Sequence, residues 1–126
     1  MASNLETIRS FIALWATRDL DAILAAMTED CFYHNMPWPP VIGQAAIRAS
    51  LEPFVGSAKA IDWLLHNIAE SPDGVVLTER TDRFAIGDDW LEMPVMGTFE
   101  LSDGKIAKWR DYFDPTPINA MMTAAA

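Results

Sequence analysis

Two carboxylates, an arginine and two neutral hydrogen-bonding side chains occur in three short stretches of an otherwise apolar chain. They are Tyr33 and Asn35, then Arg80 and Asp82, and finally Asp111. Aspartate and arginine are almost never fully buried without a partner, because an unpaired buried charge is costly. If these side chains meet inside the protein, they form the outline of an acid–base active site.

Alternation along two predicted strands points these charged side chains inward. Arg80 and Asp82 share one face of the strand predicted for residues 75–85, and Asp111 has aromatic neighbours on its face of residues 105–114. A solvated face with the same pattern would form only a surface salt-bridge ladder. For a single Asp–Arg pair that is the commoner arrangement. Two inward aspartates with one arginine favour a functional site.

Apolar side chains at inward positions are expected to form the wall of a pocket around these groups. The predicted lining residues are Ile12, Trp15, Phe54, Trp63, Phe84, Met93, Val95 and Phe113. Taken alone, each of them is more often plain core than pocket wall, since aromatic and methionine side chains fill most protein interiors. A filled core, however, has no use for five polar residues that all need partners, so their convergence favours a pocket.

Two carboxyl groups in opposite protonation states can supply a base and an acid to one reaction. Burial and mutual repulsion should raise the pKa of one aspartate, while Arg80 stabilises the other as a carboxylate. The pair then shares one proton near neutral pH. Such chemistry needs no metal and no organic cofactor. The single Cys31 and the two histidines, His34 and His66, also lack metal-ligand spacing.

Length and charge limit the other possibilities. The 126 residues, 51% of them hydrophobic, predict one domain over 1–126. The net charge of −9, without a basic face, argues against a nucleic-acid partner. No signal segment or membrane-spanning apolar run is visible. We therefore expect a cytoplasmic protein with no membrane association.

The order of the predicted elements indicates an α+β fold. Helical spacing predicts a first helix with Leu5, Ile8, Ile12 and Trp15 inward, a second from Leu20 to Met27, and a third around Ile47, Leu51 and Phe54. Strands are predicted near residues 31–33, 60–70, 75–85, 90–101 and 105–114, followed by a turn at Asp114 and an Ala-rich tail. Helices first and strands afterwards predict a curved, mixed, mostly antiparallel sheet wrapped over the N-terminal helices, enclosing a deep apolar pocket.

Three segments carry a resemblance to a known family. Residues 33–40 (YHNMPWPP), 78–82 (TERTD) and 109–114 (WRDYFD) resemble the three motifs of the limonene-1,2-epoxide hydrolase family, in the same order and at similar spacing. That family lies within the cone-shaped superfamily of cystatin-like (NTF2-like, SnoaL-like) folds. The resemblance covers nearly the whole chain.

The resemblance implies a role for each polar residue. In an Asp-Arg-Asp triad, Asp82 is the general acid, Arg80 bridges the two carboxylates and Asp111 is the general base, while Tyr33 and Asn35 hold the attacking water. The implied reaction is one-step hydrolysis of a small lipophilic epoxide, such as limonene-1,2-epoxide or cyclohexene oxide, to a vicinal diol. Substrate and water are then the only reactants, with no covalent intermediate.

The resemblance also implies a homodimer, whose surface is expected to include Met96 and Trp109. Two other function classes stay open. An enolising enzyme of the ketosteroid isomerase or polyketide cyclase type uses an aspartate base in a similar cone, although a charged bridge such as Arg80 is not needed to stabilise a dienolate. A non-catalytic small-molecule-binding domain of the same fold would leave three inward charges as an unexplained cost.

Overall fold

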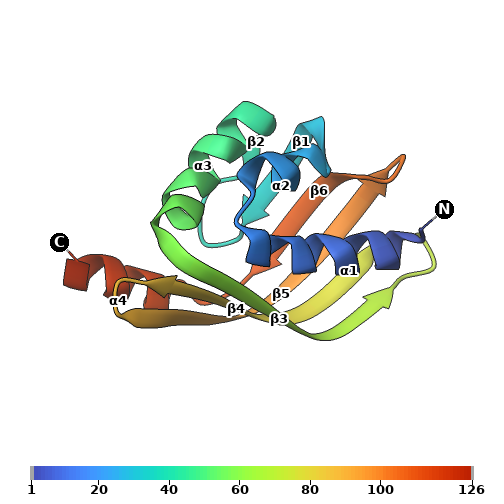
Figure 1. The fold of residues 1–126 in the computed structure, drawn as a ribbon. Coiled ribbons are helices and arrows are strands. Elements are labelled where there is room, and N and C mark those ends of the chain that lie inside the picture. Colours follow the sequence, from blue (N-terminus) through green and yellow to red (C-terminus); the bar gives the residue numbers. More distant parts are fainter. Residues whose placement is uncertain (1, 126) are drawn as a thin grey trace.

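One curved six-stranded sheet carries all the polar residues singled out above (Figure 1). The computed structural model describes residues 2–125, and side chains for residues 2–121. The helices are α1 (Asn4–Leu14), the short 3-10 turn η1 (Trp15–Thr17), α2 (Leu20–Ala25), α3 (Gln44–Ser57) and α4 (Thr116–Ala125). The strands are β1 (Met27–Asn35), β2 (Val41–Ile42), β3 (Ala58–Glu70), β4 (Val76–Ile86), β5 (Asp89–Ser102) and β6 (Lys105–Tyr112).

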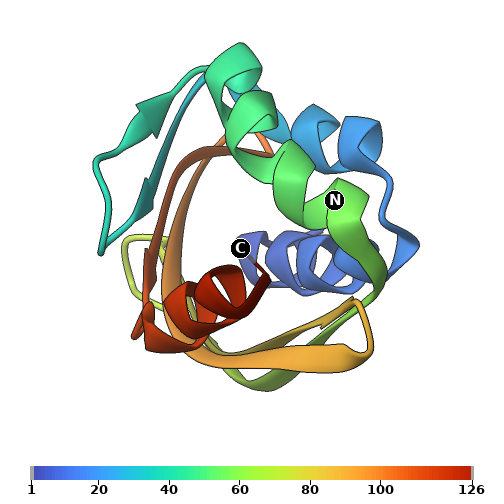
Figure 2. The same cartoon turned by 90° about the vertical axis from the view of Figure 1, so that its left-hand side faces the viewer.

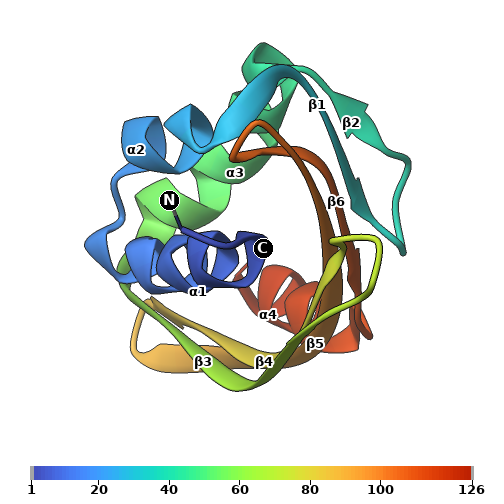
Figure 3. The same cartoon turned by 90° about the vertical axis from the view of Figure 1, so that its right-hand side faces the viewer.

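The sheet is mixed, with strand order β2-β1-β6-β5-β4-β3. Only the β1–β6 pair is parallel among these strands, and the other four pairs are antiparallel. Figures 2 and 3 view opposite ends of the molecule and show the sheet bending around α1 and α3, with α4 at the end nearer the viewer in Figure 2. The predicted α+β cone is confirmed.

Local signals set the first two helices. The Ser3 hydroxyl accepts a hydrogen bond from the Glu6 backbone N–H at 3.1 Å, and Asp19 caps α2 in the same way through the Ala22 N–H. Capping of this kind satisfies N–H groups that have no partner within the helix. Between the two helices, Arg18 takes the left-handed backbone conformation with φ of 56°, which ends η1.

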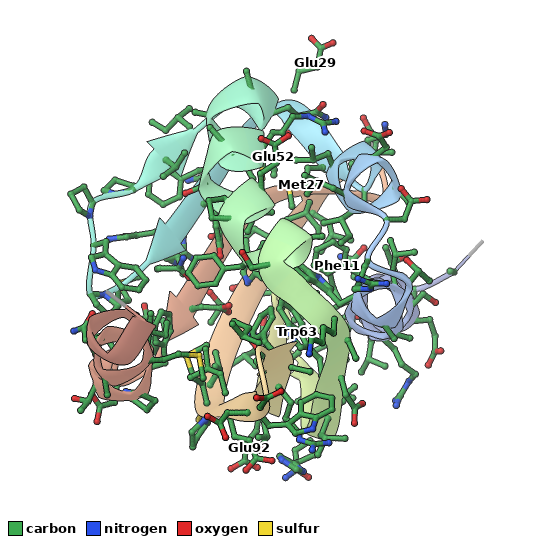
Figure 4. All side chains as sticks on the ribbon, turned by 60° about the vertical axis from the view of Figure 1, so that its left-hand side comes forward. Phe11, Met27, Glu29, Glu52, Trp63 and Glu92 are labelled. Carbon is green, nitrogen blue, oxygen red and sulfur yellow. The ribbon has the colours of Figure 1, made fainter. Side chains whose placement is uncertain are left out.

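The interior is apolar and rich in aromatic rings. Phe11 and Trp15 from the helical layer meet Phe99 and Trp109 of the sheet, with ring centroids 5.3 to 6.1 Å apart. In Figure 4 the Phe11, Met27 and Trp63 side chains lie within the fold, whereas those of Glu29 and Glu92 lie at its upper and lower edges. The polar site described below is therefore surrounded by close-packed apolar groups.

The second helix is shorter than its periodicity predicts. It ends at Ala25, and Met27, expected on its apolar face, begins β1 instead. Met27 pairs with Ile106 of β6, and the Ile106 N–H donates to the Ala26 carbonyl at 2.9 Å. Pairing with β6 thus takes over where the helical pattern would have continued, and Met27 is buried all the same.

Two predictions about β6 were wrong. Strict two-residue alternation along residues 105–114 predicts Ile106 on the face opposite Asp111, yet Ile106 is fully buried, because Ala107 has no partner in the register with β5 and the alternation shifts there. Trp109 was expected on a dimer surface, yet it is 0% exposed and packs in the core. Met96 is 53% exposed, so a dimer surface that includes Met96 stays a prediction.

The segment after β6 forms a helix, which the sequence did not predict. Asp114 accepts hydrogen bonds from both the backbone N–H and the hydroxyl of Thr116, at 2.9 and 2.6 Å, so it caps the start of α4. These bonds lower the pKa of Asp114. Within the described part of the chain, every helix is too short or too polar to span a membrane.

Candidate active site

The inward faces of β4 and β6 meet at a pocket under α3 and α4. Four of its lining residues are polar, namely Tyr33, Asn35, Asp82 and Asp111. The apolar lining residues are Trp15, Trp38, Leu51, Phe54, Trp63, Phe84, Met93, Val95, Phe113 and Ile118. Figure 4 shows Trp63 on the concave side of the sheet, between α4 and α1.

Strand register explains why residues so far apart in sequence converge. Asn35 of β1 lies beside Asp111 of β6, Asp111 lies opposite Gly97 of β5, and Gly97 lies opposite Thr78 of β4. Arg80 and Thr78 share the inward face of β4, so the Arg80 side chain can extend over the missing side chain of Gly97 toward Asp111.

Arg80 links the two carboxylates directly. Its Nε and Nη2 atoms donate to Asp82 at 3.0 and 2.8 Å, and its Nη1 and Nη2 atoms donate to Asp111 at 3.2 and 2.8 Å. Nη1 also donates to the Thr78 hydroxyl at 3.0 Å. Each of the five N–H groups of a guanidinium thus has an acceptor. Arg80 is 1% exposed, and Asp82 and Asp111 are 3% and 4% exposed.

Burial and pairing set the protonation of these groups. Burial raises the pKa of Asp82 to about 6, although the charge and hydrogen bonds of Arg80 lower it; the Asp111 charge raises it further. Burial alone would lower the pKa of Arg80, but the charges of Asp111 and Asp82 outweigh it, so the pKa lies above its usual range. Arg80 is therefore a permanent cation, and Asp82 is the carboxyl that can hold a proton near neutrality.

Tyr33 is a proton-bearing phenol at any physiological pH. Burial raises its pKa above the usual range, and the Asp111 charge adds to this effect, while a hydrogen bond with Asn35 and the charge of Arg80 partly oppose it. Its ring is tilted against Trp109 with centroids 4.5 Å apart, which fixes its orientation. Tyr33 can donate a hydrogen bond to a molecule in the pocket but cannot serve there as a base.

The structure brings together nearly all the residues expected at the site. Tyr33, Asn35, Asp82 and Asp111 line the pocket, and Arg80 joins the two carboxylates within the sheet. Of the predicted apolar lining, Trp15, Phe54, Trp63, Phe84, Met93, Val95 and Phe113 are in place. Ile12 does not line the pocket: it is 2% exposed and belongs to the core.

Several residues at the site were not predicted there by the sequence analysis, Leu51 of the pocket lining among them. Thr78 and Trp109 alternate in phase with Arg80 and Asp111, a signal that was available, but neither was assigned to the site. Trp109 donates its Nε1–H to Asp111 at 2.7 Å. Ile118 lines the pocket from α4, which was not predicted. Gly97 contributes by lacking a side chain, and only the strand register reveals that.

Gly97 gives the first testable prediction. A Cβ atom there would lie inside van der Waals contact with Asp111 Oδ1 and 2.7 Å from Arg80 Nη1, so Gly97→Ala must displace the triad. We expect kcat/KM for the acid–base reaction implied by the motif resemblance to fall at least about 10²-fold, because misplaced acid–base groups lose most of their effect. The matched control is Gly56→Ala, whose Cβ would meet nothing within 4 Å. Wild-type kcat/KM in Gly97→Ala would refute this geometry.

Comparison with known proteins identifies the family. A model of the limonene-1,2-epoxide hydrolase catalytic domain matches residues 2–124. The chain belongs to the limonene-1,2-epoxide hydrolase family. The chain is also similar to epoxide hydrolase EphG of Mycobacterium tuberculosis (strain ATCC 25618 / H37Rv), with 33% identity over 107 residues, which cover 85% of this chain and 70% of that protein. These findings support epoxide hydrolysis as the activity of this limonene-1,2-epoxide hydrolase family member.

Solved structures of two proteins share the fold of this chain. A limonene-epoxide-hydrolase-like epoxide hydrolase of M. tuberculosis superposes with a TM-score of 0.78 at 30% identity, over 93% of this chain and 86% of that one. SalBIII, an epoxide hydrolase/cyclase-like enzyme in pyran ring formation in the polyether salinomycin, superposes with a TM-score of 0.80 at 19% identity. The superposition covers 90% of this chain and 92% of SalBIII. The second likeness shows a shared fold only.

Proposed function

We propose that this member of the family adds water to a small lipophilic epoxide, of the limonene-1,2-epoxide or cyclohexene oxide type, and releases a vicinal diol. The observation that carries the proposal is the Arg80 bridge between two buried carboxylates at one pocket. One of these carboxylates, Asp82, has its pKa raised to about 6 by burial, so it can hold a proton when the other is ionised.

The proposed reaction is one concerted step of general acid and general base catalysis. Asp111 removes a proton from a water molecule as the water oxygen attacks an epoxide carbon. The C–O bond of that carbon breaks, and Asp82 gives its proton to the departing oxygen. The step ends with Asp111 protonated and Asp82 ionised, and proton exchange with water restores the starting state. Arg80 stays charged throughout and compensates the one negative charge that moves between its two partners.

The apolar wall supports the choice of substrate. Among the described lining residues the only charged side chains are the two aspartates, so the pocket offers no cation to an anionic substrate group. Its aromatic and aliphatic residues suit a compact hydrocarbon skeleton, and its four polar residues include both aspartates of the triad. A lipophilic ring bearing one epoxide matches this distribution.

A panel of epoxides tests the proposal. The purified protein is incubated with limonene-1,2-epoxide, cyclohexene oxide and an epoxide bearing a carboxylate, and products are separated by gas chromatography. We expect diols from the first two and little or none from the third. An isomerised ketone in place of diol would support an enolising enzyme. Tight retention of unchanged epoxide would support a binding domain.

Activity should decline as pH rises through the pKa of Asp82. The acid must carry its proton to protonate the epoxide oxygen, and above about pH 6 Asp82 is progressively ionised in the free enzyme. We therefore expect log kcat/KM to fall with a slope of about −1 on the alkaline side. Constant kcat/KM from pH 6 to pH 9 would contradict the role of Asp82 as general acid.

Tyr33 and Asn35 should differ in their importance to the reaction. In the proposed mechanism both side chains hold the water molecule, but neither of them takes or gives the water's proton in the transition state. Tyr33→Phe removes one donor and should retain measurable activity, whereas Asn35→Ala removes an acceptor and a donor and should lose much more. Substrate Kd should change little in either variant, because apolar contacts supply most of the binding.

Steady-state kinetics combined with direct binding measurements checks this difference. If Tyr33→Phe were as inactive as a variant without the base, Tyr33 would have to be the proton donor. The isomerase-like alternative would then move ahead of hydrolysis.

A further inference from the structure

Trp109 gives the two aspartates of the triad different hydrogen-bonding environments. Its ring is 0% exposed and is stacked on Phe99, with centroids 5.3 Å apart and planes 26° apart, and Tyr33 packs against it. This packing fixes the direction of the indole N–H, which donates to Asp111 Oδ1 at 2.7 Å.

The two aspartates differ in the number of hydrogen bonds that they accept. From the described side chains Asp82 accepts two hydrogen bonds, both from Arg80. Asp111 also accepts two from Arg80 and a third from Trp109. Because Arg80 serves both carboxylates nearly equally, it does not by itself decide which of them keeps the proton. Among the described residues, the Trp109 N–H is the donor that distinguishes them.

The chemistry of the indole N–H determines which protonation state of Asp111 it favours. An indole N–H only donates, so it cannot accept a hydrogen bond from a protonated carboxyl group. A donor aimed at a carboxylate favours the ionised form of that carboxylate. Within residues 2–121, Oδ1 of Asp111 thus takes two donors, Trp109 and Arg80 Nη1, whereas Oδ2 takes one, Arg80 Nη2. Oδ2 keeps a free lone pair with which to accept a proton from water.

We propose that Trp109 is a positioning residue that keeps Asp111 ionised and Asp82 protonated before the reaction, and so sets the direction of proton transfer across the triad. This inference rests on the proposed function for its catalytic consequence. The placement of the proton does not depend on turnover, and it can be measured without substrate. The ionisable groups that face Asp111 are Arg80 and Asp82 from β4 and Tyr33 from β1.

Carbon-13 NMR of aspartate carboxyl groups in the unliganded protein tests the inference. The Asp111 signal is assigned by its loss in Asp111→Asn and is followed from pH 3 to pH 9 in the wild type and in Trp109→Phe. Phenylalanine keeps an aromatic ring but lacks the N–H. We expect the protonated Asp111 signal to appear at a pH higher by about one unit in Trp109→Phe, as befits the loss of one charge-assisted hydrogen bond.

The matched control is Trp15→Phe. Trp15 is a neighbouring buried tryptophan whose Nε1 has no hydrogen-bond partner among the described residues. Its replacement therefore removes an indole without removing a donor to the triad. We expect the Asp111 titration in Trp15→Phe to match that of the wild type, while KM is free to change because Trp15 lines the pocket.

A second replacement covers the case in which Trp109→Phe does not fold. Benzothienylalanine at position 109 keeps the bicyclic shape and exchanges the N–H for sulfur, so its packing matches tryptophan and only the donor is lost. The same upward displacement of the Asp111 titration is expected. An Asp111 signal that titrates as in the wild type in either folded variant overturns the inference.

The pH profile of kcat/KM gives the catalytic readout. Loss of the Trp109 donor should move the acidic limb, where the base becomes protonated, upward by about the same one unit. If the NMR titration moves but no variant or wild-type protein makes diol, the proposed function fails and the role of Trp109 in placing the proton stands. If diol forms and the titration does not move, the proposed function stands and the role of Trp109 in placing the proton fails.

Discussion

Asp111→Asn should reduce kcat/KM for epoxide hydrolysis by at least about 10³-fold, and Asp82→Asn should do the same. An asparagine at position 111 cannot take a proton from water, and one at position 82 has no acidic proton to give. In the proposed mechanism the two carboxylates act in one step, so the double variant should be hardly worse than either single one. Such non-additivity is typical of residues that work as a unit.

The control for the two aspartate variants is Asp62→Asn. Asp62 is also a carboxylate paired with an arginine, since Arg83 Nη1 donates to it at 2.9 Å, but the pair lies at the surface of β3 and β4. Exposed pairs contribute little, so stability should change by no more than about 1 kcal/mol and kcat/KM should be retained. Substantial diol formation by Asp111→Asn or Asp82→Asn, with the fold checked by thermal unfolding, would reject the assignment.

Arg80→Lys should lose at least about 10²-fold in kcat/KM although it keeps the positive charge. Arg80 donates five hydrogen bonds, to Asp82, Asp111 and Thr78. A lysine ammonium has three donors and no planar fork, so it cannot hold both carboxylates in this geometry. Arg80→Ala should also destabilise the fold by about 3–5 kcal/mol, because it leaves buried charges unpaired.

Arg83→Lys is the matched control for Arg80→Lys. Arg83 lies on the same strand and also bridges two carboxylates, those of Asp62 and Glu92 at 2.9 and 2.7 Å, but on the outer face. Its replacement should leave kcat/KM in place and change stability by less than about 1 kcal/mol. Near-normal rates in Arg80→Lys, measured beside this control, would mean that Arg80 acts only as a point charge.

Much of the site could be predicted from the sequence because β4 obeys a strict alternation. Thr78, Arg80, Asp82 and Phe84 are all buried, as their two-residue spacing implies. The motif resemblance then added the pairing with Asp111, which no local pattern contains. Fold class and family were both confirmed, since they depend on features spread over the whole chain rather than on one boundary.

Two of the failures, at Ile106 and Gly97, depend on register between distant strands. The bulge at Ala107 that turns Ile106 inward exists only in the pairing of β6 with β5. The need for Gly97 arises only because that pairing sets it opposite Asp111. Trp109 was assigned to a dimer surface although it alternates in phase with Asp111, so there the available pattern was not applied.

The end of the chain illustrates a different limit. The helix α4 contains Pro117 and follows directly on Asp114 and Pro115, a composition that indicates a turn as readily as a helix start. Ile118 is 3% exposed and lines the pocket, so tertiary contact with the pocket stabilises what local propensity left undecided.

The central claim is that water attacks the epoxide directly, with Asp111 as base and Asp82 as acid, and that no bond forms between enzyme and substrate. Its most direct test is a single turnover of cyclohexene oxide in ¹⁸O-labelled water with enzyme in excess, followed by mass spectrometry of the diol and of the aspartate-containing peptides. The account predicts one ¹⁸O atom in the diol and none in the protein. Unlabelled diol in the first turnover, with ¹⁸O in a carboxyl group of Asp82 or Asp111, would contradict it.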